Sequence, residues 1–195
     1  MKISEYIKLS IDATERGELE SALMHVCSAV DGTAKKAYPT MNAGERFCKL
    51  INDNIDIVEL LFGGIDLKET IFPFPYKSRG TLTFAEILYH KYRCFLVHGD
   101  ELENGYGVSP QIDIGVQQFS INLANNSISL PQSTIYALGL LCVLSPVNAD
   151  HKIGNYQYWY SDPINKYVID RWWGKIDCAR SIMDFAGQVK VKMVF

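Results

Sequence analysis

A cation and a titratable ring stand together in the segment YRCFLVHG, residues 92–99. The Arg93 guanidinium can bind a phosphate through two parallel hydrogen bonds, and the His98 imidazole can accept or donate a proton near neutral pH. Five steps along an α-helix turn the chain by about 140° net, so the two side chains do not stack. They converge only if Arg93 reaches along the helix groove, if the helix distorts near His98, or if a second subunit supplies its own copy.

The ionisation of His98 decides what chemistry this segment can do. Gly99 is typical of the position just after a helix end, which places His98 in the last turn, where the helix dipole favours the imidazolium ion. The charge of Arg93 favours the neutral ring instead. The expected balance is a histidine that titrates near neutrality, which suits general acid–base catalysis. Spacing alone also allows a structural alternative, in which Arg93 extends to water and His98 caps backbone carbonyl groups.

Helical periodicity dominates the chain that would position these two residues. Apolar residues recur at helical spacing in four stretches that are bounded by capping residues, glycine or proline. Helices are therefore predicted over residues 15–38 after an N-cap at Thr14, over residues 43–62 after an N-cap at Asn42, from Thr81 or Thr83 to near Gly99, and from Pro131 to Ser145. Prolines and a glycine in residues 65–80 predict a loop before the third helix.

One segment has the alternating pattern of a β-hairpin instead. In FSINLANNSISL, residues 119–130, a turn at Asn125-Asn126 would pair Leu123 with Ile128 and Ile121 with Leu130. The polar stretch at 104–109, NGYGVS, is predicted as a turn. The predicted fold class is mainly α, a four- to five-helix bundle with an attached β-hairpin.

The predicted organisation is a single domain over residues 1–195, with the aromatic-rich tail of residues 147–195 packed on it. Within this tail, residues 176–185 have the pattern of a short helix and the final VKVKMVF that of a strand. The aromatic clusters YQYWY and RWW are expected to pack over a core edge, in preference to stacking on nucleobases.

Composition limits the classes of partner. The net charge of −3 argues against a general polyanion binder, so any RNA contact must come from a local basic patch. No apolar run reaches the roughly 18 residues of a spanning helix, and the N-terminal residues do not resemble a secretory signal. The five cysteines form no CxxC pair, which argues against a zinc ribbon. A cytoplasmic protein with no membrane contact, metal or cofactor is expected.

Arg93, four intervening residues, His98 and then Gly99 at the end of a bundle helix resemble the motif of the HEPN superfamily, the higher eukaryotes and prokaryotes nucleotide-binding domains. The expected helix over residues 15–38 is also similar to the family, with the polar Asp31 late in an apolar helix. Active members often have Asn, Asp or His directly after the arginine, where this chain has Cys94. The resemblance covers roughly residues 15–145.

The resemblance implies a metal-independent endoribonuclease of a toxin or phage-defence system. His98 would act as general base on a ribose 2′-hydroxyl or as acid on the leaving oxygen, and Arg93 would bind the phosphate, leaving a 2′,3′-cyclic phosphate. Lys91, Tyr92, Cys94 and Asp31 would form the substrate-binding surface for the RNA. Because the chain has one such motif, this mechanism requires a homodimer. An antitoxin or another protein is a further expected partner.

Two alternatives remain open from the sequence. A non-catalytic HEPN-like module would bind a nucleotide, RNA or a protein and use Arg93 and His98 as scaffold residues. A helical interaction protein would have no such site. The acidic groups of NDNID (residues 52–56) and Glu59 are expected to form a solvated helix face, and the Asp150-His151 pair is too small a set for a metal site.

Overall fold

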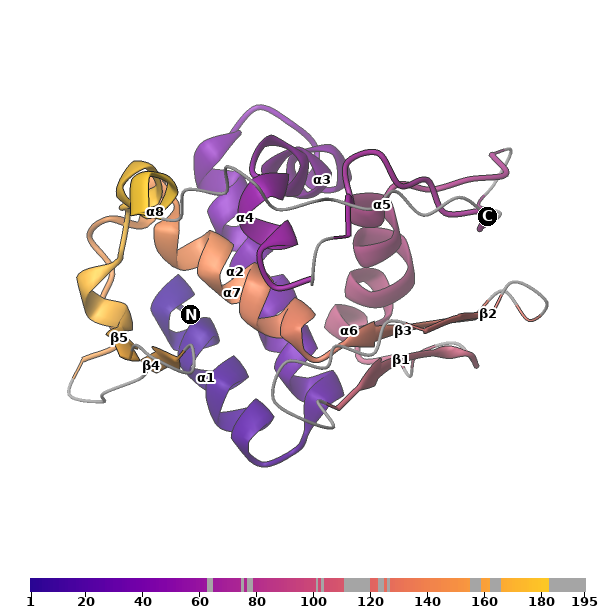
Figure 1. Cartoon of the computed structure of the whole chain (residues 1–195), viewed down its shortest axis with the longest axis horizontal. Helices are drawn as coiled ribbons and strands as arrows, with labels where there is room; N and C mark the ends of the chain where they lie inside the picture. The colour runs from indigo at the N-terminus through magenta and orange to yellow at the C-terminus, as the bar shows by residue number, and fades with distance from the viewer. Residues whose placement is uncertain are drawn as a thin grey trace.

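Helices make up most of the chain in the computed structural model, with two small sheets at its edges (Figure 1). The structure describes residues 1–62, 65–74, 76, 79–100, 102, 104–110, 120–122, 125, 127–154, 159–161 and 166–182, with the backbone alone at 159–161, 166–167 and 182. The helices are α1 (Ile3–Glu15), α2 (Leu19–Ala37), α3 (Ala43–Asp53), α4 (Ile55–Glu59), α5 (Phe84–Ile87), the π-helix η1 (Leu88–Arg93), α6 (Cys94–His98), α7 (Ser133–Leu144), the 3₁₀-helices η2 (Pro146–Asn148) and η3 (Ile169–Arg171), and α8 (Ile176–Ile182). The strands are β1 (Tyr106–Ser109), β2 (Ser120–Asn122), β3 (Ser127–Pro131), β4 (Trp159–Ser161) and β5 (Lys166–Val168). The predicted mainly helical class with an attached hairpin is confirmed.

Helix α2 is the central element of the core. It packs against α1, α3 and α7, and Figure 1 shows α7 lying diagonally across it. Helix α7 is apolar around its whole circumference and is almost completely buried, as expected for a helix enclosed by others. These helices hold the α5–η1–α6 segment from one side, because both η1 and α6 pack on α2.

The first predicted helix, over residues 15–38, corresponds to α2, and a further helix, α1, precedes it. Gly17, with φ of 76°, separates α1 from α2, so the predicted start near residue 15 is wrong and α1 was missed. Thr14 is not an N-cap, because its hydroxyl donates to the Ser10 carbonyl inside α1. Ser10 in turn donates to the Ala22 carbonyl, which joins the two helices.

The second predicted helix begins as expected but breaks early. Asn42 caps α3 by accepting a hydrogen bond from the Glu45 amide at 3.0 Å. Asn54 then interrupts the helix, and its side chain donates to the Leu50 carbonyl at 2.9 Å. The chain resumes as the short α4. The predicted end at residues 63–64 lies outside the described part of the chain.

The helix that carries Arg93 and His98 is a composite of three pieces. Thr83 caps α5 in a reciprocal capping box with Glu86, which confirms one of the two predicted starts. The middle is the π-helix η1, and α6 ends at Gly99 in the left-handed conformation with φ of 81°. Both predicted boundaries hold, whereas the π segment has no signal in the sequence.

The hairpin is confirmed, but its predicted register is wrong. Ile121 lies opposite Ile128, and Ser120 opposite Ser129, a shift of two residues from the prediction. The connection is longer than two residues, and the Asn122 side chain accepts from the Asn125 amide in place of a tight Asn-Asn turn. A two-residue shift preserves which side chains share a face, so the apolar face survives.

Two further predictions fail at this sheet. Residues 106–109 form β1, which pairs in parallel with β3, instead of a turn. Pro131 ends β3 and precedes α7 without forming its first turn. Parallel pairing of β1 with β3 joins segments that no local pattern connects.

The described elements near the C-terminus, β4, β5 and α8, lie at the end of the molecule farthest from the three-stranded sheet (Figure 1). Trp173 is 5% exposed and belongs to the main core, and the Gly174 amide donates to the Val143 carbonyl of α7. Part of the aromatic tail therefore packs over the core edge, as predicted for RWW. The predicted short helix is present as α8, and the predicted final strand lies outside the described residues.

Candidate functional site

Arg93 and Asp31 meet between α2 and the end of η1. The Arg93 Nε atom donates to Asp31 Oδ2 at 2.6 Å, and the side chains are 15% and 16% exposed. The Arg93 guanidinium also lies over the Tyr89 ring, 5.4 Å from its centroid. One edge and one face of the guanidinium are thus fixed, while within the described part of the chain its two Nη groups make no hydrogen bond.

Burial shapes the electrostatics of this pair. It raises the pKa of Asp31 above its ordinary value, although the hydrogen bond and charge of Arg93 act in the opposite direction. Burial alone would lower the pKa of Arg93, but the Asp31 hydrogen bond and charge outweigh it and raise that pKa. Arg93 therefore keeps its positive charge at this partly buried position.

A second arginine lies close enough to act on the same carboxylate. The charge of Arg46 on α3 also lowers the pKa of Asp31, against the larger effect of burial. Within the described residues, Arg46 Nε and Asp31 Oδ1 are both buried without a hydrogen-bond partner. Two cations thus surround one anion, which leaves the cluster with a net positive charge. No local pattern in the sequence indicated Arg46, because the carboxylate on which its charge acts lies on another helix.

His98 lies at the exposed end of α6. Its side chain makes no hydrogen bond or ion pair within the described part of the chain, and it is accessible to water. The Asp100 amide donates to the Phe95 carbonyl across the Gly99 turn, so backbone groups close this helix end. The structural alternative, with His98 capping the carbonyl groups, is therefore not what the structure has.

The geometry between Arg93 and His98 is that of a regular α-helix. The π distortion covers residues 88–93 and ends at Arg93, and the residues from 94 to 98 form the regular helix α6. The two side chains thus keep the net separation of about 140° around the axis. The predicted route of convergence by helix distortion near His98 is wrong, which leaves a long reach by Arg93 or a second copy of the chain.

Tyr92 is a core residue and cannot contact a ligand as predicted. Its side chain is 0% exposed, and its hydroxyl donates to the Ile128 carbonyl at 2.7 Å and the Gly107 carbonyl at 3.2 Å. The phenol anchors η1 to the sheet that β1 and β3 form. The prediction failed because the tyrosine lies beside Arg93 in sequence but on the opposite, sheet-facing side of the helix.

Lys91 and Cys94 flank the pair at half-buried positions. The Lys91 ammonium lies 5.1 Å from the centroid of the Tyr106 ring, so this lysine faces β1. Lys91 and Cys94 remain predicted substrate-binding residues, and the structure brings Asp31 into contact with Arg93.

Glu59 and His151, two ionisable residues noted outside the motif, contact other parts of the fold. Glu59 is 5% exposed and accepts from the Lys68 amide, so the predicted solvated face is wrong at this residue. His151 contacts the Lys36 ammonium at 2.9 Å and packs against the Trp173 ring. Among the described residues, no group of three or more His, Cys, Asp or Glu side chains is arranged to hold a metal ion.

The comparisons with known proteins give a family but no activity. A sequence profile named Rv1289 matches residues 2–195, so the chain belongs to the Rv1289 family. The uncharacterized protein Rv1289 of Mycobacterium tuberculosis is 31% identical over 191 residues, which cover 94% of this chain and 89% of the relative. The uncharacterized protein Mb1320 of Mycobacterium bovis matches with the same identity and coverage. No solved structure matches significantly. The HEPN resemblance therefore stays a prediction.

The helices also bear on membrane contact. Across the ranges that the structure describes, none of them is both long enough and apolar enough to cross a bilayer. The longest apolar helix, α7, has 12 residues and lies in the core.

Proposed function

We propose that this protein is a metal-independent endoribonuclease of the HEPN type, active as a homodimer. Arg93 binds the scissile phosphate, and His98 removes the proton from the ribose 2′-hydroxyl or donates one to the leaving oxygen. The 2′-oxygen then attacks the phosphorus, the bond to the 5′-oxygen breaks, and a 2′,3′-cyclic phosphate remains.

The observation that carries this proposal is the way Arg93 is held. Asp31 accepts a hydrogen bond from Arg93 Nε, and the Tyr89 ring covers one face of the guanidinium. The Nη groups are therefore oriented, but they make no hydrogen bond within the described residues. A guanidinium fixed at one edge loses little entropy when its other edge binds a phosphate. Arg46 adds positive charge beside it. Asp31 and Tyr89 are thus positioning residues for Arg93.

The dimer follows from the angle between the two groups. Because α6 is regular, Arg93 and His98 of one chain point to different sides of the helix. A two-fold axis near the end of α6 would bring His98 of one chain to Arg93 of the other. The exposed position of His98 leaves it available for such a contact.

A non-catalytic module is the second candidate, and a specific observation favours it. The Arg93 side chain is only 15% exposed and already bound to a carboxylate, which is what a scaffold residue looks like. In this case the same surface binds a nucleotide, RNA or a protein without cleavage, and Cys94 stands where active HEPN members have a polar residue.

Cleavage of single-stranded RNA in EDTA tests the proposal. We expect the wild type to cleave and to leave cyclic phosphate ends, and His98→Ala to lose at least about 100-fold in rate. His25→Ala, at a half-buried position on α2, is the matched control and keeps the rate. Cleavage that persists in His98→Ala contradicts the assigned base, and no cleavage by wild type favours the second candidate.

Mixing two inactive variants tests the shared site. If Arg93 of one chain works with His98 of the other, Arg93→Gln and His98→Ala rebuild one intact site in each mixed dimer. Random mixing then restores about a quarter of the wild-type activity, since half the dimers are mixed and each has one working site of two. A strict monomer in sedimentation, or no restoration after mixing, contradicts the composite site.

The biological setting is proposed as cytoplasmic. RNA substrates are found there, and the five cysteines are unpaired thiols, as a reducing compartment requires. A toxin or phage-defence role, with an antitoxin as protein partner, follows from the family resemblance. Growth arrest on expression of wild type, absent with His98→Ala, is the expected sign of this role.

A further inference from the structure

A hollow of about 480 Å³ opens between α3 and the α5–η1 segment. Its volume lies within the range of pockets that hold small molecules. One wall is α3 and the other is the helix that continues to Arg93. The lining includes Asn42, Glu45 and Asn52 on the first wall and Glu86, Tyr89 and His90 on the second.

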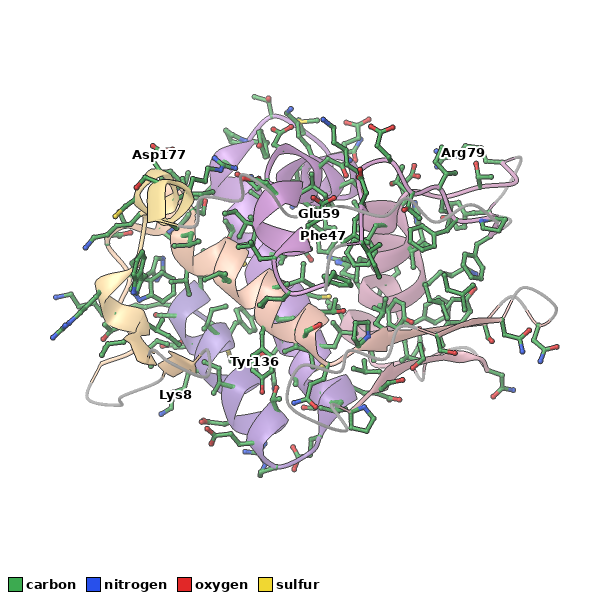
Figure 2. The ribbon with its side chains drawn as sticks, in the orientation of Figure 1. Lys8, Phe47, Glu59, Arg79, Tyr136 and Asp177 are labelled. Carbon is green, nitrogen blue, oxygen red and sulfur yellow. The ribbon has the colours of Figure 1, made fainter. Side chains whose placement is uncertain are left out.

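Tyr89 connects this hollow to Arg93. Its ring lines the hollow and also has the Arg93 guanidinium over it at 5.4 Å. Gly44 allows the ring to sit against α3, because a Cβ atom there would come within 3.0 Å of the ring. Phe47 packs on Tyr89 from the core side, with 5.4 Å between ring centroids, whereas Arg79 lies at the periphery of the molecule (Figure 2). The hollow thus opens next to the proposed phosphate position.

The charge of the lining does not suit a second phosphate. Arg79 is the one lysine or arginine among the lining residues, and it is neutralised by Glu86 at 2.6 Å. Glu45 adds a further negative charge at an exposed position. An anion would meet net repulsion in this hollow, so the phosphate belongs on the Arg93 side and an uncharged group belongs here.

The remaining lining groups are those that recognise a nucleobase. Tyr89 and His90 present aromatic rings, and His90 is stacked on Tyr76 with 4.0 Å between centroids. The Asn42 and Asn52 side chains offer amide groups, and Glu45 offers a carboxylate that can accept from an exocyclic amine. Unpaired bases in RNA are commonly bound by aromatic stacking together with hydrogen bonds to their edges.

We propose that the hollow binds an unpaired nucleobase of the nucleotide whose phosphate contacts Arg93. This inference rests on the proposed function and adds its substrate class, single-stranded RNA with an extruded base. The base would enter between the amides of α3 and the rings of η1. Cys48, which also lines the hollow, is no nucleophile there, because burial raises its pKa to about 12.

The test measures binding to His98→Ala protein, so that RNA is not cleaved. The probes are a fluorescent single-stranded RNA nonamer and the same nonamer with one central abasic nucleotide, which keeps every phosphate. We expect the intact RNA to bind about ten-fold more tightly than the abasic one. Asn52→Leu should weaken the intact RNA toward the abasic value. Gly44→Ala, which displaces Tyr89 and thereby disturbs Arg93, should weaken both RNAs and the intact one more.

Matched controls separate the hollow from general effects. Gly80→Ala adds the same methyl where nothing lies within 4 Å, and it should leave both affinities unchanged. Asn52 is exposed, so Asn52→Leu keeps the fold even if Gly44→Ala destabilises it. Equal loss for intact and abasic RNA, no effect of Asn52→Leu, or no binding of either RNA at tens of micromolar protein overturns the nucleobase site.

The two proposals fail in different ways. If His98→Ala abolishes cleavage but the abasic RNA binds as tightly as the intact RNA, the ribonuclease stands and the nucleobase site is wrong. If wild type never cleaves but Asn52→Leu removes a ten-fold preference for the intact RNA, the nucleobase site stands and the protein is a binding module.

Discussion

Within the part of the chain that the structure describes, two arginine–aspartate pairs have the same first contact and different surroundings. In both, arginine Nε donates to aspartate Oδ2 at 2.6 Å: Arg93 to Asp31 and Arg180 to Asp56. The first pair joins η1 to α2, and its side chains are 15% and 16% exposed. The second joins α8 to α4 at the other end of the molecule, and its side chains are 36% and 40% exposed.

The pairs differ in how much of the arginine is used. Arg180 also donates from Nη2 to Asp56 Oδ1 at 2.8 Å and to Asn54 Oδ1 at 3.1 Å, so its fork is occupied by the protein. Arg93 gives Asp31 only Nε and leaves Asp31 Oδ1 without a partner within the described residues. In the exposed pair, the hydrogen-bonding groups of arginine and aspartate are occupied within the protein, and the contact holds α8 against α4. Within the described residues, the less exposed pair leaves the two Nη groups of Arg93 without a hydrogen bond and Asp31 Oδ1 buried without a partner, so Arg93 can still bind another molecule.

The largest expected difference is in stability when the arginine is removed. Arg93→Leu leaves a buried carboxylate without a partner and should lower the free energy of unfolding by about 3 kcal/mol. Arg180→Leu breaks an exposed pair and should cost about 1 kcal/mol or less. Urea unfolding at pH 7 measures both. Equal losses would mean that burial does not distinguish the two pairs.

Removing both members of the buried pair should restore most of the loss. In Arg93→Leu with Asp31→Leu, no charge remains unpaired, so the double variant should lie within about 1 kcal/mol of wild type. The corresponding double variant at Arg180 and Asp56 should gain little over its single variants. A double variant at the buried pair that is as unstable as Arg93→Leu would show that packing, and not charge, causes the loss.

The two aspartates should respond to pH in opposite directions. Although burial alone would raise the pKa of Asp56, the hydrogen bond and charge of Arg180 hold it below its ordinary value. Its stabilisation is therefore present above the unfolded pKa of about 3.9 and is lost as pH falls through the folded value. Because the pKa of Asp31 is raised by burial, its contribution is full below that pH and is lost as pH rises through the folded value.

Unfolding of Asp56→Asn and Asp31→Asn from pH 3 to pH 7 measures this contrast. The advantage of wild type over Asp56→Asn should grow with pH, by less than about 1 kcal/mol because this pair is exposed. The advantage over Asp31→Asn should shrink over the same range. The same sign of slope for both variants would contradict the assignment.

The smallest expected effect is that of salt. In 1 M NaCl the screening length falls to about 3 Å, which weakens exposed pairs more than buried ones. The coupling energy of Arg180 with Asp56, from a double-mutant cycle, should fall by a few tenths of a kcal/mol. The coupling of Arg93 with Asp31 should remain unchanged, and an equal decrease would place that pair in contact with bulk solvent.

Local signals made part of this architecture predictable. Asn42, Thr83 and Gly99 bound their helices as sequence rules require, because caps depend on residues within one turn. The Asn125-Asn126 signal indicated a hairpin, but not its register, which depends on a longer connection. Helix α1 and the break at Gly17 were missed because the apolar spacing that predicts the helix over residues 15–38 begins only at Leu19.

Contacts between segments that lie far apart in the chain could not be predicted from the sequence. Asp31 and Arg93 are 62 positions apart, and nothing in either helix predicts their 2.6 Å contact. The hydrogen bond from the Tyr92 hydroxyl to the Ile128 carbonyl could not be predicted either, because only the fold brings β3 beside this tyrosine. Gly44 resembles any helical glycine until the Tyr89 ring is seen against it. The candidate residues of the motif could be named, whereas their environment required the fold.

The π-helix at Leu88–Arg93 sets the direction in which every later residue of that helix faces. A π turn accommodates one residue more than an α turn, so it acts as a single-residue insertion that the surrounding helices absorb. Deleting one residue there would return the segment to ordinary α geometry and leave Arg93 facing nearly the same way, whereas a change of all six residues to α geometry would rotate Arg93 by about 100° relative to α5. The direction of Arg93 therefore depends on the π conformation of this short stretch as well as on the identity of its arginine.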